Sequence, residues 1–300
     1  MPLKSVAILT PGDMGHAVGR ALREHGLEVL TCLRGRSQRT HALAQEAGIR
    51  DVPTLEALVA QADLVLSIVV PEAAQEVARR VAAALRATGA GTLYADCNAI
   101  SPETTARVAH TIGAAGGRFI DASIIGGPPG AGRPPPRFYV AGPHARAMEA
   151  LDGKGIVVRS AGDTVGRASA LKMCYAALTK GTSALHIALL SVAQVLGVAE
   201  ELRRELEESQ PDAVRFMQRQ VPTIPHRAGR WVSEMEEIAA TFEAAGLTPG
   251  FHRAAAEVYR LVAATPLGRE TPETRDRSRT LEQTIAAIVR ALPSPAARPG

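Results

Sequence analysis

The segment formed by residues 6–22 constrains the fold of this chain more than any other part of its sequence. An apolar run of strand length breaks at Pro11-Gly12, and an amphipathic segment with apolar residues at helical spacing follows at once. A strand that enters a helix through a tight glycine turn exposes free backbone N–H groups, and the positive end of the helix dipole points at the turn. The segment therefore predicts an anion-binding turn.

This turn keeps the second and third glycines of the pattern found in dinucleotide-binding folds. Gly12 and Gly15 stand where the backbone approaches a pyrophosphate and where the helix packs against the strand, whereas Thr10 replaces the first glycine. An ordinary glycine-rich loop is the alternative, and the alternation of elements that follows argues against it. The expected cofactor contacts in the turn are Thr10, Pro11, Gly12, Asp13 and Met14.

A basic segment follows the second expected strand, about 20 residues beyond the glycines, where the adenosine ribose of a dinucleotide lies. NAD enzymes usually carry Asp or Glu there, but residues 34–40 contain three arginines, two hydroxyl side chains and no carboxylate. Because guanidinium groups bind phosphate through paired hydrogen bonds, the segment favours NADP(H) over NAD(H). We expect Arg34, Arg36 and Ser37 to contact the 2′-phosphate and Arg39 to face solvent. The alternative is a solvated basic loop.

Strands and helices alternate through the first half of the chain. The patterns predict strands at residues 28–33, 63–70, 91–96, 118–122, 137–142 and 155–158, and helices that end at residue 47 or cover residues 54–61, 72–87 and 102–113. This alternation specifies an α/β fold with a Rossmann-type, doubly wound and mostly parallel sheet. Ligands of such sheets lie beyond the carboxyl ends of the strands, where the sequence places Val70, Pro71, Asn98 and Ser123.

From residue 165 onward the sequence shows one helical pattern after another. Apolar residues occur on nearly every face of residues 168–196, which predicts a long buried helix. We expect a nucleotide-binding domain at residues 1–164, an all-α substrate and dimerisation domain at residues 165–290, and a disordered tail at residues 291–300. The apolar helices exceed what one small domain easily buries, which suggests a homodimer.

Composition restricts the function classes. The net charge of +4 is spread along the chain, so we expect no nucleic acid partner. Three widely spaced cysteines indicate a reducing compartment and no metal site. No segment approaches about 18 uninterrupted apolar residues and the start shows no signal-peptide pattern, so we expect a cytoplasmic protein without a membrane partner.

Four motifs make the chain similar to the β-hydroxyacid dehydrogenase superfamily, which includes 3-hydroxyisobutyrate and 6-phosphogluconate dehydrogenases, and within it to a branch whose C-terminal domain has no known function. The resemblance covers residues 4 to about 265. The family's glycine turn corresponds to residues 10–15, and the proline after the strand that flanks the cofactor corresponds to Val70-Pro71. The substrate loop corresponds to residues 121–127 and the catalytic segment to residues 166–175. The resemblance implies hydride transfer between nicotinamide and a small hydroxyacid or oxo compound.

The resemblance also implies that Lys172 is the general acid and base. Such a lysine takes the proton of the substrate hydroxyl in oxidation and donates it in reduction, and apolar neighbours would lower its pKa. The alternative is a lysine whose stem is buried while its ammonium reaches water. Lys180, two helical turns further on and on roughly the same face, ranks second.

Several positions depart from the family pattern. Tyr175 replaces the asparagine three residues after the lysine, and Ile125 replaces the loop serine that meets a substrate carboxylate, although Ser123 lies two residues earlier. Asn98, where relatives often have serine, either contacts the substrate or the nicotinamide amide, or caps the following turn. The expected catalytic residues are Lys172, Tyr175 and Asn98, and the expected substrate contacts are Ser123, Ile125, Gly126, Gly127, Lys172 and His226. The departures favour a substrate that is larger or less acidic than a simple β-hydroxyacid, or an imine or ketone.

A segment of the helical half carries the only tryptophan, in a helix expected at residues 230–245. In one interpretation, His226 or Arg230 contacts a substrate, which can be bound in the cleft of a partner subunit. In the other, the segment is a capped helix in which Trp231 packs and Arg230 pairs with Glu234. We favour packing and ion pairing, and we keep His226 as a substrate candidate. Residues 200–208 are expected to form a solvated charged helix face.

Three functional hypotheses follow. The main one is an NADPH-dependent oxidoreductase that acts on a hydroxy or oxo compound. The second is imine reduction, because imine reductases share the architecture and vary the residue at the lysine position; Lys172 favours alcohol chemistry, whereas Tyr175 and Ile125 weaken that preference. The third is a non-catalytic NADPH-binding sensor or partner protein, in which Lys172 would be dispensable.

Overall fold

The structure, a computed structural model, describes residues 3–292. The chain forms two compact units, residues 1–173 and residues 174–300. The tail expected to be disordered lies outside the described residues, apart from residues 291 and 292.

The first unit contains one eight-stranded sheet with the strand order β3-β2-β1-β4-β5-β6-β7-β8. Its strands are β1 (Ser5–Ile8), β2 (Glu28–Thr31), β3 (Arg50–Asp51), β4 (Leu64–Ser67), β5 (Leu93–Asp96), β6 (Arg118–Ile125), β7 (Arg137–Ala141) and β8 (Val157–Gly162). All neighbouring strands are parallel except β6 and β7, which confirms the mostly parallel α/β sheet. The strand order reverses between β1 and β4, and this reversal opens a crevice at the carboxyl ends of the two strands.

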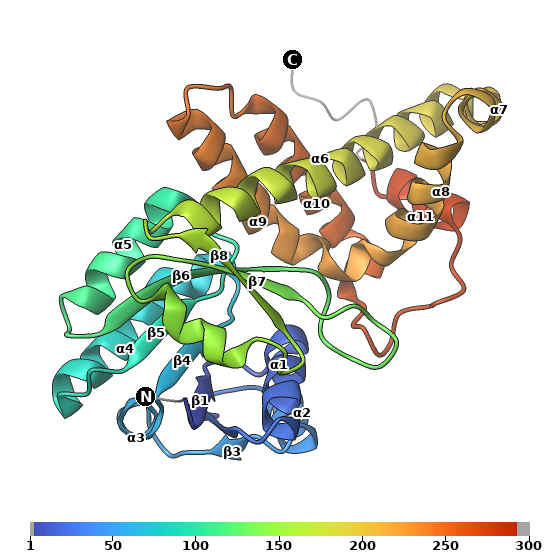
Figure 1. Ribbon diagram of the computed structural model, residues 1–300. Helices are drawn as coiled ribbons and strands as arrows, with labels where there is room; N and C mark the ends of the chain where they lie inside the picture. Colours follow the sequence, from blue (N-terminus) through green and yellow to red (C-terminus); the bar gives the residue numbers. More distant parts are fainter. Residues whose placement is uncertain (1–2, 293–300) are drawn as a thin grey trace. The chain divides into compact units, whose positions relative to one another are not determined.

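Helices cover both faces of this sheet (Figure 1). They are α1 (Asp13–Glu24), α2 (Gln38–Glu46), α3 (Leu55–Gln61), α4 (Ala74–Thr88) and α5 (Pro102–Gly113), with a 3₁₀ turn (Pro71–Ala73) before α4. Successive residues of β1, and Leu9 directly after it, belong to two different cores. Val6 and Ile8 pack with α1 and α2, whereas Ala7 and Leu9 pack with α3, α4 and α5. Both faces of β1 are buried, and this explains why residues 6–9 are apolar throughout and do not alternate with polar residues.

The helix α6 (Arg167–Leu196) begins inside the first unit, where Asp121 of β6 caps its N-terminus. The buried carboxylate of Asp121 accepts hydrogen bonds from the backbone N–H groups of Gly166 at 2.8 Å and Ala168 at 3.0 Å, and from Ser169 Oγ at 2.6 Å. Burial raises the pKa of Asp121, and these hydrogen bonds oppose the shift. The anchor explains why the units divide after Met173 and not at the expected boundary, residue 164.

Replacing Asp121 with alanine should lower the free energy of unfolding by about 2–4 kcal/mol, because a helix cap is lost and buried N–H donors are left without acceptors. Urea denaturation of the full chain measures the loss. The matched control is Asp163→Ala, an exposed aspartate just before the same helix, which should change stability by less than about 0.5 kcal/mol. Equal losses in the two variants would contradict a capping role.

The second unit consists of helices and the segments that connect them, and residues 174–292 contain no strand, as predicted. Beyond α6 it contains α7 (Ala199–Ser209), α8 (Pro211–Gln220), α9 (Pro225–Ala244), α10 (Gly250–Ala264) and α11 (Leu281–Arg290). The charged helix expected at residues 200–208 is α7, which buries none of its side chains. The start of α9 was predicted too late, at residue 230, because a proline ring is compatible with the first helical turn and Pro225 begins the helix.

By length and composition, α6 is the one helix among the described residues that is apolar enough to cross a membrane. Its most apolar window is 56% buried inside the protein. The buried side carries polar groups, including Lys180, Ser183 and His186. Polar side chains packed against other helices are typical of a core helix in a globular unit.

Candidate dinucleotide-binding and catalytic site

The turn between β1 and α1 has the geometry of an anion site. Gly12 is the N-cap residue of α1 and provides no side-chain hydrogen bond to the first turn of the helix. A Cβ atom added at Gly12 would meet no atom within 4 Å, so the space in front of the helix N-terminus is open. A Cβ atom at Gly15 would lie 2.2 Å from the carbonyl oxygen of Thr10, so only glycine allows the helix to approach the strand this closely. Pro11 is buried beneath the turn and Met14 is half-buried.

Thr10 and Asp13 affect how this turn can bind an anion, and the glycine pattern does not predict either effect. Thr10 Oγ1 is buried and has no hydrogen-bond partner within the described part of the chain, so a hydroxyl donor remains available at the first glycine position. Asp13, whose charge would repel a phosphate, forms an ion pair with Arg39. Arg39 is exposed, as predicted, and its guanidinium reaches Asp13 of α1 from the start of α2. An uncapped helix N-terminus, an open cradle and a free hydroxyl fit a pyrophosphate.

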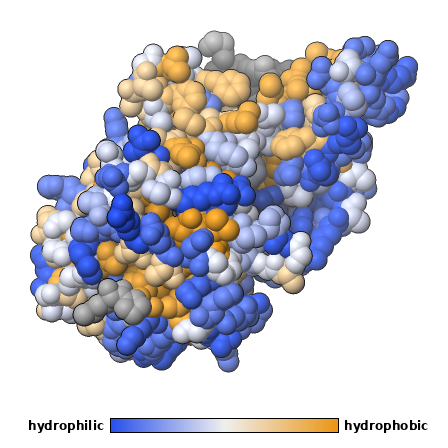
Figure 2. Space-filling view, viewed as in Figure 1, coloured by the Kyte–Doolittle hydropathy of each residue, from blue (hydrophilic) through white to orange (hydrophobic). Residues whose placement is uncertain are grey.

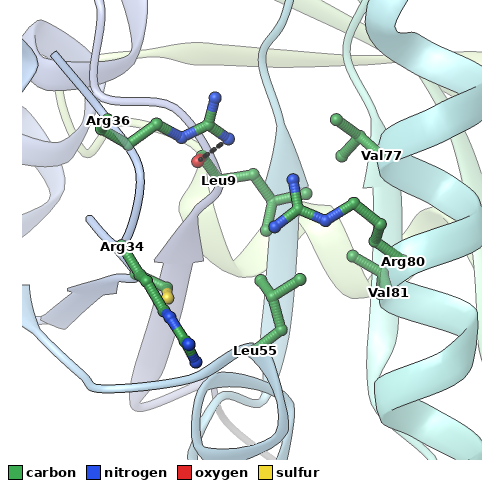
Figure 3. A pocket seen from close by; sticks show the side chains of 8 residues that line it. Leu9, Arg34, Arg36, Leu55, Val77, Arg80 and Val81 are labelled. Atoms are coloured by element: carbon green, nitrogen blue, oxygen red, sulfur yellow. Dashed lines mark hydrogen bonds between the residues drawn. The ribbon is translucent and has the colours of Figure 1, made fainter.

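The basic segment after β2 borders a pocket (Figure 3). Arg36 is half-buried, and its guanidinium donates a hydrogen bond to the carbonyl oxygen of Leu9 at 3.3 Å. Arg34 lines the same pocket from the exposed side. Ser37 caps α2, since its Oγ accepts a hydrogen bond from the backbone N–H of Thr40 at 3.3 Å. The structure thus places both predicted arginines at one pocket and gives Ser37 a structural role.

The same pocket is lined by Arg80 of α4, which sequence reasoning missed. Nothing in the local pattern marks this residue, because an arginine on an amphipathic helix normally faces solvent. The topological signal is the position of α4, which follows β4 and therefore lies next to the strand-order reversal. Leu9, Cys32, Leu55, Val77 and Val81 complete the lining.

Asn98, after β5, ties the ends of two strands together. It is buried; its Oδ1 accepts a hydrogen bond from the N–H of Val69 at 2.6 Å, and its Nδ2 donates to Ser67 Oγ at 3.2 Å. These bonds fix the chain that leads into Val70 and Pro71. These bonds are neither of the two predicted roles, since Ser101 caps the following helix and contact with a substrate or the nicotinamide amide stays a prediction.

Lys172 lies in the second turn of α6 and is fixed against the end of β6. Its Nζ donates a hydrogen bond to the carbonyl oxygen of Ile124 at 2.7 Å. The flanking residues Ser123 and Ile125 are fully or almost fully buried, and Ser123 Oγ has no hydrogen-bond partner among the described residues. The sequence-predicted lysine and substrate strand are thus brought together at the carboxyl edge of the sheet.

Three further candidates differ in their surroundings. Gly126 and Gly127 are exposed and begin the loop after β6, and Gly126 has a φ of 119°, which favours glycine. Tyr175, one helical turn after Lys172, is 44% exposed. His226 is the second residue of α9 in the helical unit, where it is half-buried, and its substrate role stays a prediction.

Lys180, the second-ranked lysine, belongs to the core of the helical unit. It is buried, forms an ion pair with Glu234 and lies 5.4 Å from the ring centroid of Trp231. Arg230 also pairs with Glu234 at 3.4 Å, as predicted, and the Trp231 ring packs edge-on against Tyr259 at 5.3 Å. Because the charge of Lys180 is neutralised inside the fold, Lys172 is the stronger candidate for proton transfer.

A doubly wound sheet with an uncapped helix N-terminus at its strand-order reversal defines the class of dinucleotide-binding proteins. Residues 5–153 match the NAD binding domain of 6-phosphogluconate dehydrogenase, and residues 193–262 match the domain of unknown function DUF1932. An uncharacterised 28.5 kDa protein of Methanothermus fervidus is 32% identical over 186 residues, which are 61% of this chain and 69% of that protein. The chain belongs to the family that joins a 6-phosphogluconate-dehydrogenase-type NAD-binding domain to a DUF1932 domain.

Solved structures agree with this assignment. The conserved protein MTH1747, described as structurally similar to 3-hydroxyacid dehydrogenases, is 28% identical with a TM-score of 0.63, covering 86% of this chain and 96% of that one. The 3-hydroxyisobutyrate dehydrogenase of Mycobacterium tuberculosis shares the fold at 19% identity and a TM-score of 0.66, covering 95% and 99%. An imine reductase of Streptomyces aurantiacus also shares the fold, at 19% identity and a TM-score of 0.53, and the match covers 94% of this chain and 98% of that one. The chain therefore carries an NAD-binding domain and shares its fold with 3-hydroxyacid dehydrogenases and with an imine reductase.

Proposed function

We propose that this protein is an NADP(H)-dependent oxidoreductase that interconverts a small hydroxy compound and its oxo form. The observation that carries the proposal is the position of Lys172, whose ammonium is held at the end of β6 by the Asp121-anchored start of α6. The glycine turn after β1 lies at the same carboxyl edge of the sheet. A proton-transfer group and a dinucleotide turn at one edge are the two parts that such a reaction needs.

The chemistry is divided between the cofactor and the chain. Nicotinamide, when bound, accepts or supplies the hydride. In oxidation Lys172 takes the proton of the substrate hydroxyl as the C–H bond yields its hydride and the C=O bond forms; in reduction Lys172 returns the proton to the oxygen. The buried Ser123 hydroxyl and the N–H groups of Gly126 and Gly127 are the proposed groups that orient the substrate.

A paired substrate screen tests this proposal. Purified protein is mixed with NADPH or NADH and with short 3-oxo acids, aldehydes, ketones and cyclic imines, and the loss of reduced-nicotinamide absorbance is followed. We expect turnover of an oxo compound with NADPH and slower turnover with NADH. Turnover of imines alone would replace the proposed reaction with C=N reduction, and binding of NADPH without turnover of any carbonyl or imine would support the sensor hypothesis.

Imine reduction is the second candidate because of one feature of β6. Ile125 stands where the family has a carboxylate-binding serine, and its side chain is only 3% exposed. The strand end therefore offers less hydrogen bonding to an acidic substrate than the family pattern does. His226 is the proposed additional substrate contact under either chemistry.

We also propose a homodimer formed through α6. Leu171, Leu178, Leu185 and Val192 follow one another at seven-residue intervals, and each is at least 37% exposed. Figure 2 shows hydrophobic side chains exposed over the helical part of the chain. A stripe with this period is complementary to a second copy of itself.

We also propose that the protein is located in the cytoplasm. Its three cysteines are free thiols, which supports a reducing compartment.

The homodimer predicts a mass twice that of the 31.5 kDa chain in light scattering. Leu185→Glu should shift the population to monomers, because it places a charge in the middle of the apolar stripe. The control Glu205→Gln, on the exposed α7, should leave the mass unchanged. A monomeric wild-type protein would contradict the proposal.

A further inference from the structure

The pocket beside β2 gathers three guanidinium groups from two parts of the chain. Arg34 and Arg36 follow β2, and Arg80 comes from α4. Figure 3 shows Arg36 and Arg80 extending toward the same space from opposite sides. On α4, Val77 and Val81 share the pocket-facing side with Arg80, as their helical spacing requires.

Arg80 is poised for an external anion. Within residues 3–292, neither Arg80 nor Arg34 forms an ion pair or a hydrogen bond, whereas the adjacent Arg79 is paired with Glu76. Burial first, and then the charge of Arg80, lower the pKa of Arg36. The two cations therefore repel each other across the pocket, and a dianion between them would relieve that repulsion.

The remaining lining indicates the organic part of the ligand. Leu9, Leu55, Val77 and Val81 form apolar walls next to the arginines. An aromatic base can pack against such walls and against a guanidinium plane, while a phosphate takes paired hydrogen bonds from the same groups. This combination fits an adenosine that carries a phosphomonoester on its ribose.

We propose that Arg80 is a specificity-determining residue that reaches from α4 to the 2′-phosphate of NADP(H). The inference rests on the proposed function and extends it to a residue outside the segment after β2. Arg80 supplies the far side of a phosphate clamp whose near side is Arg34 and Arg36. Selection of NADP(H) over NAD(H) is then shared between two separate elements.

Equilibrium titrations of wild type, Arg80→Ala and Arg79→Ala test the proposal. Each protein is titrated with NADPH and NADH by fluorescence, and with adenosine 2′,5′-bisphosphate and adenosine 5′-diphosphate by calorimetry. We expect Arg80→Ala to weaken NADPH and the 2′,5′-bisphosphate by about tenfold to a hundredfold, with NADH and the 5′-diphosphate changed less than about twofold. Arg79→Ala, the neighbouring arginine that is already paired, should match wild type.

The outcomes separate this inference from the proposed function. If wild type prefers NADPH and Arg80→Ala keeps that preference, or weakens all four ligands equally, the role of Arg80 is overturned while NADP(H) binding stands. If wild type prefers NADH, the 2′-phosphate clamp is overturned and an NAD-dependent oxidoreductase remains. If wild type binds none of the four ligands, both the clamp and the proposed function fail.

Discussion

Replacing Lys172 with alanine should lower kcat by about 10²–10⁴-fold with little change in the affinity for NADPH, because the variant lacks the group that moves the proton. Lys172 Nζ lies 2.7 Å from the carbonyl oxygen of Ile124, at the end of the strand that carries the substrate loop. Steady-state kinetics on the substrate found in the screen, together with nucleotide titration, separate the chemical step from cofactor binding.

Two controls sharpen this result. Lys172→Arg keeps a cation in place but cannot give up its proton near neutral pH, so it should remain slow. Added small amines should partly restore the alanine variant, since they can enter the space left by the side chain and carry the proton. Unchanged turnover in Lys172→Ala would contradict the proposed chemistry and leave either another proton donor or the sensor hypothesis.

Replacing Glu234 with alanine should lower the free energy of unfolding by about 3–5 kcal/mol, the cost typical of breaking a buried ion pair on one side. The loss leaves the ammonium of Lys180 buried without its carboxylate, close to the Trp231 ring and to other cations. Burial and neighbouring arginines already lower the pKa of Arg227 to about 10, so this core has little tolerance for further positive charge. Chemical denaturation measures the loss.

The double variant Lys180→Met/Glu234→Leu is the matched control. It removes both charges and fills the space with apolar side chains of similar volume, so it should recover most of the stability lost in Glu234→Ala. If the double variant is as unstable as the single one, packing and not charge would explain the effect. If it is stable and Lys172 variants alone abolish turnover, Lys180 has a structural role and Lys172 the chemical one.

The sheet was largely predictable because its strands are buried on both faces and therefore appear as apolar runs. The helix predicted at residues 102–113 has the observed bounds, Pro102–Gly113, because Ser101 caps its start and Pro102 occupies its first turn. The strand β3 was missed because it has two residues and both are exposed. A short exposed strand carries no apolar periodicity.

The site was predictable only where chemistry is local. The glycine turn and the arginines after β2 carry their signal in consecutive residues, so the sequence indicated them. Arg80 and the Asp121 cap depend on contacts between distant segments, and Asp121 lies 45 residues before Gly166. No local pattern reports such contacts, and the same limit explains why the hydrogen bonds of Asn98 to Ser67 and Val69 were not predicted.

Binding of NADP(H) for hydride transfer is tested by fluorescence titration of wild type with NADPH and NADH, repeated with Arg34→Ala/Arg36→Ala. We expect NADPH to bind wild type at least about tenfold more tightly than NADH, a difference of about 1.4 kcal/mol, and the double variant to lose this preference. Absence of binding of either nucleotide to wild type would contradict this expectation, because Thr10 would then have disabled the glycine turn, and the proposed oxidoreductase would have no hydride carrier.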